Sequence, residues 1–381
     1  MRVLLLTFCF ALTVQLIHAQ ADYRQGTVYL DGATSLTVGN AKYLKPDNVW
    51  QNPTVLQSNR VGIASRPVGV FAFDRLLVGA YMSYTNSWQG ENFLDGSGGD
   101  LQTYRINPFV RYYVLAGAER KWNLFAELGF GTWGSGTYST FETDFHLGAG
   151  VEMPLLPGVV GTAKLAYNAY ADGLNYTTLG IRGNLLLGQL GKLVQAPLSR
   201  GTWTTRGELA SASVGHMRRG GNDWLDYGYS FSPSVGYFVT DGLLLASHSR
   251  LTYANNKNEI SPNMATQLNN FQYVQFRTEL EARYYPWRNG TVLPYAGAAL
   301  GYSYSKMDSE RNNNPNNRGQ VSSLWRATAG VSYFLGQSVA LEASASYERE
   351  GSNYEGNGFT NAPFKFRNLG LDAGFAFYFG R

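Results

Sequence analysis

The chain has 381 residues, of which 15% are charged, 14% are aromatic and 44 are glycine, and its formal net charge is +4. Few charges and many aromatic residues exclude an intrinsically disordered protein, whose composition is the reverse. Lysine and arginine do not cluster along the chain, so nothing supports nucleic-acid binding by a basic surface.

Residues 1–19 predict a secretory signal peptide. Arg2 supplies the positive charge, Val3 to Val14 form the apolar core, and Ile17-His18-Ala19 precedes a predicted cleavage site. The apolar run is about a dozen residues, short of the ~20 that a membrane-spanning helix needs. Cys9, the single cysteine, lies in this segment. An exported chain without disulfides or spanning helices is either a soluble β-domain or an outer-membrane barrel.

From Gly26 onward, apolar and polar residues alternate in one segment after another, which is the period of a β-strand. The clearest case is Phe271 to Tyr285, long enough to cross a bilayer, since a transmembrane barrel strand needs roughly 9–11 residues. In chain order, the predicted strands lie near 26–39, 67–73, 76–85, 103–115, 123–133, 144–154, 159–170, 178–188, 201–214, 229–239, 243–253, 271–286, 292–305, 323–334, 339–349 and 367–379. This is a prediction of about sixteen strands.

The connections between these strands alternate in length. Long polar loops are predicted at 40–66, 86–101, 255–270, 306–321 and 351–366, and tight turns at 74–75, 156–158, 240–242, 288–290 and 336–337. A soluble sandwich has no reason to keep its long loops at one end, whereas short turns at one end and long loops at the other are typical of a transmembrane barrel. The fold class predicted is therefore an all-β, transmembrane, antiparallel up-and-down β-barrel.

The two halves of the chain form an internal repeat. Asp31-Gly32 aligns with Arg206-Gly207, and Arg111-Tyr112-Tyr113 aligns with Arg283-Tyr284-Tyr285. The period is too long for a solenoid, whose repeats run about 20–50 residues, so it indicates duplication of an eight-strand unit. We predict a first repeat over 20–188, a linker over 189–200 and a second repeat over 201–381.

Each half resembles the small eight-stranded barrels of the OmpA-like superfamily, in the form common as outer membrane β-barrel domain proteins. The resemblance is carried by the stretch from Ser232 to Asp241, by the two Arg-Tyr-Tyr motifs, and by the closing segment from Leu369 to Phe379. It implies a location in the outer membrane of a Gram-negative cell, with the lipid bilayer as partner and the barrel-assembly machinery as a partner during biogenesis. Family members typically end on an aromatic residue, whereas here Gly380 and Arg381 follow Phe379.

The strands could close as one sixteen-stranded barrel or as two eight-stranded barrels. A single aromatic-rich final strand favours one barrel, and we slightly favour it. The long linker and the mixed charges within each half favour two. The choice decides the function, because about eight strands leave an interior filled by side chains, while sixteen leave an aqueous channel. We therefore predict a porin-like passive diffusion channel, with a non-conducting OmpA-like structural or adhesive barrel as the alternative.

One side of each strand is apolar and is predicted to face lipid, including Phe375, Phe377 and Phe379 of the last strand. The other side carries charges of both signs and is predicted to face a lumen. These charges either neutralise one another, since buried charges are rarely left unpaired, or select permeating solutes. The lumen-facing candidates are Arg105, Arg111, Glu127, Glu152, Lys164, Arg182, Arg277, Glu279, Glu281, Arg283, Arg326, Glu342, Glu348 and Asp372.

No catalytic, metal or cofactor site is predicted. His248 lies between Ser247 and Ser249, but neighbours on a strand point to opposite faces, so His248 cannot form a dyad with either serine. An outer-membrane lipid hydrolase therefore remains a minor alternative, and the chain is expected not to be an enzyme. The mature chain has no cysteine and no clustered histidines, which argues against a metal site. The oligomeric state cannot be inferred from the residues.

Overall fold

The computed structural model describes residues 23–31, 35–44, 55–64, 67–89, 101–117, 120–135, 140–170, 174–187, 196–206, 208–219, 222–259, 269–311, 314–356, 359–360 and 364–379. The predicted signal peptide lies outside them. Every element there is a β-strand, and each long pairing between neighbours is antiparallel. In the described part of the chain, no helix is long and apolar enough to cross a membrane.

The strands are β1 (Val28–Asp31), β2 (Ser35–Leu44), β3 (Val55–Ala64), β4 (Val68–Phe73), β5 (Leu76–Gln89), β6 (Leu101–Leu115), β7 (Asn123–Ser135), β8 (Thr140–Leu156), β9 (Val159–Tyr170), β10 (Leu174–Leu187), β11 (Trp203–Arg206), β12 (Glu208–Arg219), β13 (Asn222–Phe231), β14 (Ser234–Thr240), β15 (Leu243–Glu259), β16 (Asn269–Tyr284), β17 (Val292–Arg311), β18 (Asn314–Gly336), β19 (Val339–Gly356), β20 (Phe359–Thr360) and β21 (Phe364–Phe379).

Tight turns gather at one end of the strands, which we call the turn end; the opposite end is the loop end. Short connections follow β4, β8, β14, β16 and β18, as the sequence predicts. Gly158, Gly242 and Gly290 hold positive φ angles there, a conformation that glycine adopts without steric cost. Two predicted loops are wrong: in the first, residues Val55–Ala64 form strand β3, and the predicted loop over 306–321 lies almost entirely in β17 and β18, which extend beyond the predicted strands.

At the turn end, the strands close into two separate eight-strand barrels. In the first barrel, each strand from β4 to β10 pairs with the next one along the chain. Strand β1 pairs with both β4 and β10 and so closes the ring. In the second barrel, β11 pairs with both β14 and β21 in the same way. The predicted fold class is confirmed. The turn end closes as two eight-stranded barrels, which was the alternative to the single barrel that we favoured.

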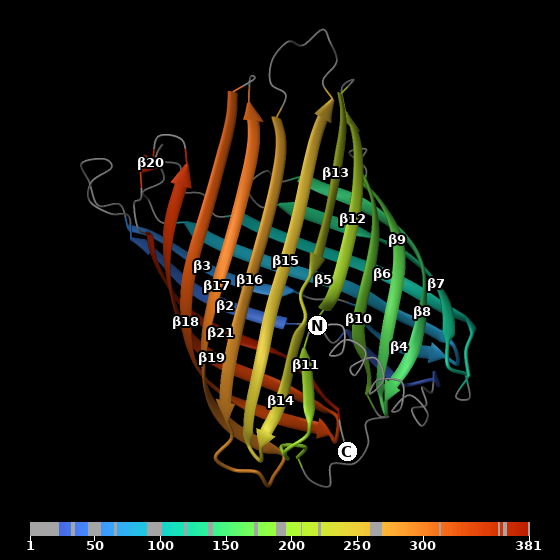
Figure 1. Cartoon of the computed structure of the whole chain (residues 1–381). Helices are drawn as coiled ribbons and strands as arrows, with labels where there is room; N and C mark the ends of the chain where they lie inside the picture. The colour runs from blue at the N-terminus through green and yellow to red at the C-terminus, as the bar shows by residue number, and fades with distance from the viewer. Residues whose placement is uncertain are drawn as a thin grey trace.

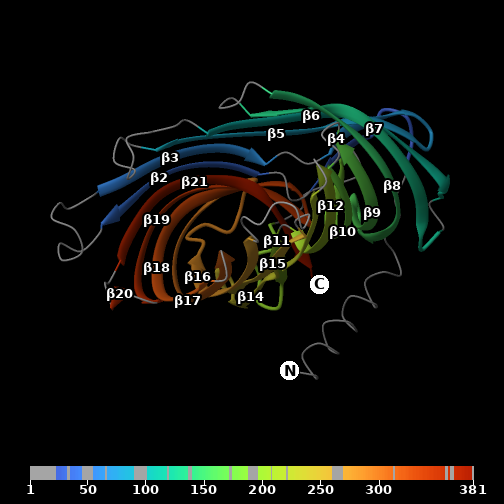
Figure 2. The same cartoon turned by 90° about the horizontal axis from the view of Figure 1, so that it is seen from above.

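Toward the loop end, the same strands exchange partners and join the two halves. There β10 pairs with β12, and β21 pairs with β2. The resulting ring runs β2-β3-β5-β6-β7-β8-β9-β10-β12-β13-β15-β16-β17-β18-β19-β21 and returns to β2, which makes sixteen segments. The single barrel that we favoured thus exists only in the loop-end part of the strands (Figures 1 and 2).

A glycine lies at the exchange of partners in β10 and in β21. Gly183 lies between Arg182, the last residue paired with β12, and Asn184, the first paired with β1. Gly374 lies on β21 between the residues that pair with β2 and with β11. In the sequence, Gly32 follows β1 and Gly207 follows β11, although both lie outside the described residues. Glycine within a strand often marks a tight bend, and in β10 and β21 it lies where the strand changes partners.

Outward-facing apolar residues of the two barrels pack together at the turn end and form a seam between them. Its buried members are Leu156, Val159 and Leu185 of the first barrel and Val339 and Phe377 of the second, with Leu30, Leu155, Leu187, Leu335, Phe375 and Phe379 packed around them. The prediction that the aromatic residues of β21 face lipid is therefore wrong for Phe377, which is only 3% exposed.

Candidate functional site: buried ion-pair clusters inside both barrels

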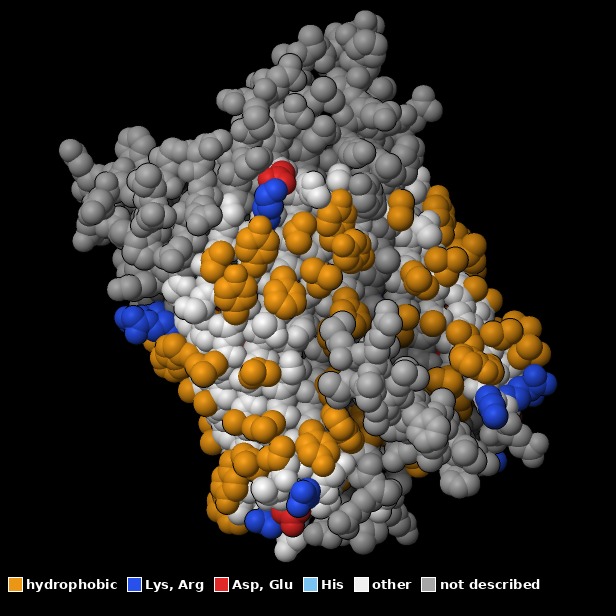
Figure 3. Space-filling view, in the orientation of Figure 1, with side chains coloured by type: hydrophobic (Ala, Val, Ile, Leu, Met, Phe, Trp, Pro, Cys, Tyr) orange, Lys and Arg blue, Asp and Glu red, His pale blue; other side chains and the backbone are white. Residues whose placement is uncertain are grey.

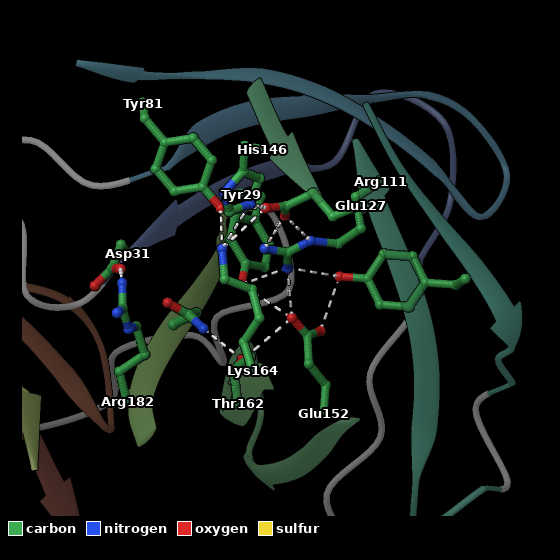
Figure 4. A network of polar contacts seen from close by, with 12 residues as sticks. Tyr29, Asp31, Tyr81, Arg111, Glu127, His146, Glu152, Thr162, Lys164 and Arg182 are labelled. Atoms are coloured by element: carbon green, nitrogen blue, oxygen red, sulfur yellow. Dashed lines mark hydrogen bonds and ion pairs between the residues drawn. The ribbon is translucent and has the colours of Figure 1, made fainter. Parts of the chain in front are cut away.

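The interior of the first barrel is organised around Arg111 on β6. Its guanidinium donates to Glu127 Oε2 on β7 through Nε and Nη2, both at 2.7 Å, and to Glu152 Oε1 on β8 through Nη1 at 2.8 Å. Side chains of alternating residues point inward on adjacent strands, which brings the three groups together across the barrel (Figure 4). The Arg111 side chain is 2% exposed, and both carboxylates are fully buried.

Hydroxyl groups satisfy the remaining oxygen positions of Glu152. Tyr29, Tyr113, Tyr23 and Thr162 donate to it over distances between 2.9 and 3.2 Å. Tyr23 precedes the first strand, and burial, reinforced by the negative charge of Glu152, raises the pKa of its hydroxyl well above the usual value. The hydroxyl therefore stays protonated and continues to donate.

A second group of side chains surrounds Glu127. Lys164 Nζ donates to its Oε1 at 2.9 Å, Tyr81 donates at 2.5 Å, and His146 Nε2 lies 2.6 Å away (Figure 4). The other ring nitrogen of His146 lies 2.8 Å from Asn168. Arg111 and Lys164 match the two carboxylates of this cluster in charge.

Two further ion pairs lie on the loop-end side of this cluster. Arg105 Nη2 lies 2.7 Å from Asp144 Oδ2, and Arg182 Nη1 lies 3.0 Å from Asp31 Oδ2. In both pairs the carboxylate is buried, while the cation is partly exposed. The charged interior thus continues up to the level at which the two barrels merge.

The second barrel has a matching cluster around Arg283 on β16, whose side chain is also 2% exposed. It donates to Glu281 at 3.0 Å and to both oxygens of Glu342 on β19 at 3.1 Å. Its guanidinium carbon lies 4.1 Å from the centre of the Tyr295 ring. Arg206 on β11 also pairs with Glu342.

Above this cluster, toward the loop end, lies a second layer of ion pairs. Arg277 contacts Glu279 at 2.7 Å and Glu348 at 2.8 Å, and Arg326 contacts Glu279 at 3.0 Å. The carboxylates are buried, whereas about a quarter of each arginine side chain is exposed, at 27% for Arg277 and 24% for Arg326.

The two clusters keep the same arginine but take their carboxylates from different strands. Arg111 and Arg283 are equivalent in the repeat. The position of Glu127 in the first repeat corresponds to Gly297 in the second, because both follow the aligned Phe125-Ala126 and Tyr295-Ala296 pairs. The second repeat instead uses Glu281 and Glu342. A buried arginine bound to two glutamates is thus common to both barrels, although its acidic partners differ.

The mouth of each barrel at the turn end is filled by a residue that precedes its first strand. Tyr23 packs among Phe71 and Tyr113, and Leu198 packs among the buried residues of the second barrel. The carbonyl of Tyr23 accepts from the Arg75 N–H at 3.0 Å, and that of Leu198 accepts from the Gly242 N–H at 2.7 Å. Buried charged clusters and apolar residues thus lie inside both barrels.

The structure places the sequence-predicted residues as follows. Two sets lie in buried clusters, namely Arg111, Glu127, Glu152 and Lys164 in the first barrel, and Glu281, Arg283 and Glu342 in the second. A looser layer of ion pairs contains Arg105, Arg182, Arg277, Glu279, Arg326 and Glu348. Asp372 is exposed and lies beside the strand exchange, opposite Thr37.

Sequence reasoning missed three charged residues of these networks: Asp31, Asp144 and Arg206. Asp31 and Arg206 each end a four-residue strand, too short for alternation to assign a face. Their alignment as Asp31-Gly32 and Arg206-Gly207 was the signal that could have identified them.

A serine partner for His248 was also missed. Ser234 on β14 faces His248 across the sheet, with Ser234 Oγ 2.8 Å from His248 Nδ1. His248 Nε2 lies 2.8 Å from Glu281 Oε2, which completes a Ser234–His248–Glu281 chain of hydrogen bonds. The prediction that Ser247 and Ser249 cannot serve does not exclude a partner on a neighbouring strand. Among the described residues, no group of three or more histidine, cysteine or acidic side chains could hold a metal ion.

No protein-family model matches the chain, and no curated protein sequence matches it. Several solved outer membrane proteins do. OprG from Pseudomonas aeruginosa is 15% identical, with 50% of this chain and 99% of OprG covered and a TM-score of 0.28. Neisserial surface protein A is 22% identical, with 46% and 97% covered and a TM-score of 0.22. OccK2 from Pseudomonas aeruginosa is 11% identical, with 94% and 99% covered and a TM-score of 0.31. Likenesses at these TM-scores do not indicate the function of this chain.

Proposed function

We propose that the chain is an integral protein of the bacterial outer membrane whose two barrels are closed to solutes and which acts as a structural or surface-binding barrel. Membrane insertion is supported by the outward face of the strands, where large apolar side chains such as Leu128, Phe130, Leu280 and Leu300 are more than half exposed. Figure 3 shows apolar side chains over the middle of one face and charged side chains at its margins. A bilayer would cover that apolar belt.

The observation that carries the closed state is the burial of Arg111 and Arg283. Arg111 is bonded to carboxylates on β7 and β8, and Arg283 to one carboxylate on its own strand β16 and one on β19. An interior of about eight strands has only enough width for its own side chains. Solutes entering the wide loop-end ring would meet two filled barrels at the turn end.

Conductance across a planar lipid bilayer tests this proposal. The refolded protein, verified by different gel mobility before and after heating, should give no stable open current. A large and stable open current would instead support the porin-like alternative, in which the sixteen-segment ring continues into an aqueous path. Any binding partner of a closed barrel would be met at the loop end.

A second candidate function is hydrolysis, favoured by the Ser234–His248–Glu281 chain alone. A serine hydrogen-bonded to a histidine that is oriented by a carboxylate is the arrangement of an activated nucleophile. Glu281 is also bonded by Arg283, which fits a structural use of the same groups. Labelling with a fluorophosphonate probe separates the two functions: modification that is lost in Ser234→Ala would support a hydrolase, and an unlabelled folded protein would remove it.

A further inference from the structure

Among the residues that the structure describes, the turn end has more exposed cations than exposed acids. Its exposed cations in the described part of the chain are Arg24, Arg75, Arg120, Lys121, Arg200 and Arg288, whereas its exposed acids there are Asp74 and Asp241. Both acids are engaged in turns, since Asp74 Oδ1 accepts from the Gln25 N–H at 3.0 Å and Asp241 Oδ1 accepts from the Arg200 N–H at 2.8 Å. Six exposed cations against two exposed acids leave a surplus of positive charge among these described residues.

Arg75 holds a backbone conformation that does not suit arginine. Its φ is 68°, in the left-handed region, and it is the one non-glycine residue with positive φ in the described chain. The corresponding turn of the second barrel has Gly242 at this position, with φ 77°. A left-handed conformation is strained for a residue with a Cβ, and such strain gathers at sites where a side chain has a function.

The backbone around Arg75 is firmly held while its side chain is exposed. Its N–H donates to the Tyr23 carbonyl at 3.0 Å, and its carbonyl accepts from the Tyr113 N–H at 2.9 Å. The second contact joins the Arg75 turn to the end of β6, which leads into the turn that carries Arg120 and Lys121. The three cations thus belong to adjacent turns of the same barrel.

Exposed aromatic residues border these cations on the barrel wall. Phe73 is 64% exposed and Trp122 is 56% exposed, and each lies within two residues of a cation in the sequence. Aromatic residues at the ends of transmembrane strands lie at the level of the lipid headgroups. The neighbouring cations would therefore lie at the height of the headgroup phosphates.

We propose that the turn end of the first barrel binds the headgroup phosphate of an anionic phospholipid, held by Arg75, Arg120 and Lys121. This inference rests on the proposed membrane location. A guanidinium presents paired N–H donors that match two phosphate oxygens, and lysine adds a point charge. The arginine at a position suited to glycine supplies the planar donor group that Gly242 lacks in the second barrel.

The test measures lipid retention by native mass spectrometry of the full folded protein, released from micelles containing equal amounts of phosphatidylglycerol and phosphatidylcholine with the same acyl chains. The wild type should retain phosphatidylglycerol severalfold over phosphatidylcholine, with the preference falling as salt screens the charges. Arg75→Gly should lose most of the preference, and Arg75→Lys should keep part of it.

The same variant provides the control for folding. Arg75→Gly should unfold on heating at no lower temperature than the wild type, because glycine suits the turn better. Arg288→Gln, in the second barrel, removes an exposed cation already paired with Asp241 at 3.6 Å and should keep the lipid preference. Equal retention of both lipids by the wild type, or an equal loss in Arg288→Gln and Arg75→Gly, would overturn the proposal.

Adding glycerol phosphate to the same micelles shows whether the site binds a lipid headgroup or a soluble phosphate. Displacement of the bound lipid by millimolar glycerol phosphate would assign the site to a soluble anion and overturn the lipid proposal, whereas unchanged retention supports it. The outcome is independent of the proposed closed state. A conducting barrel that prefers phosphatidylglycerol would refute only the closed state, and a closed barrel without lipid preference would refute only this inference.

Discussion

Replacing Arg111 by glutamine tests whether the ion-pair cluster holds the first barrel together. The change removes two bonds to Glu127 and one to Glu152, all between 2.7 and 2.8 Å. Glu127 keeps Lys164 beside it, whereas Glu152 keeps only neutral hydroxyl donors. Removing one partner of a buried ion pair typically costs about 3–5 kcal/mol, because the other charge stays buried and uncompensated.

The matched control is Arg105→Gln, which breaks the pair with Asp144 through a side chain that is 31% exposed. Water reaches the arginine of this pair, and Asn107 still donates to the buried Asp144 carboxylate after the change, so we expect a smaller loss than for Arg111→Gln. Free energies of unfolding would come from urea titrations in lipid, followed by the mobility difference between folded and unfolded protein. If Arg111→Gln cost no more than Arg105→Gln, the cluster would not be the structural centre that we infer.

A second-site change gives an independent check. Glu152→Gln removes the charge that Arg111→Gln leaves uncompensated, so the double variant should lose less than the sum of the two single losses. Neighbouring residues of one network show interaction energies of about 0.5–3 kcal/mol. Strict additivity would mean that the two side chains act separately, which contradicts the 2.8 Å contact between them.

The exchange of strand partners and the seam give further predictions. Cysteine pairs at Leu30 with Leu185, and at Val38 with Leu371, face each other across paired strands and should both form disulfides within one chain, because facing residues lie about 4.5–5.5 Å apart. The Leu30–Leu185 disulfide would not form if the whole chain closed as a single barrel. The Val38–Leu371 disulfide would not form if the two barrels were separate over their full height. Electrophoresis without reductant detects both disulfides. Phe377→Ala should destabilise the fold by about 3–5 kcal/mol in the same urea titration, because it empties a buried position of the seam. Leu371→Ala, on the exposed outward face, should cost clearly less.

The barrel class was readable from sequence because alternation and turn spacing are local properties. Strand β3 was missed because Val55–Ala64 places polar residues without a regular period. The number of barrels was not readable, because the same alternation serves either closure. The number of barrels depends on which strand pairs with each part of β10. Asn184 pairs with β1 and Arg182 pairs with β12, and this register joins segments that are distant in the sequence.

The charged networks could be predicted in part from the sequence, because alternation is a local property. Alternation assigned Arg111, Glu127 and Glu152 to one face, but only strand pairing shows that they meet. Ser234 illustrates the limit, since its distance of 2.8 Å from His248 arises from cross-strand register and not from proximity in sequence.

The strand exchange makes the two halves mutually dependent. A first half expressed alone could still join β1 to β10 at the turn end, but the loop-end parts of β2 and β10 would have lost β21 and β12. Each would then offer a row of unpaired N–H and C=O groups, the kind of open edge that recruits another chain and promotes aggregation. Neither half could therefore be deleted without leaving unpaired strand edges on the half that remained.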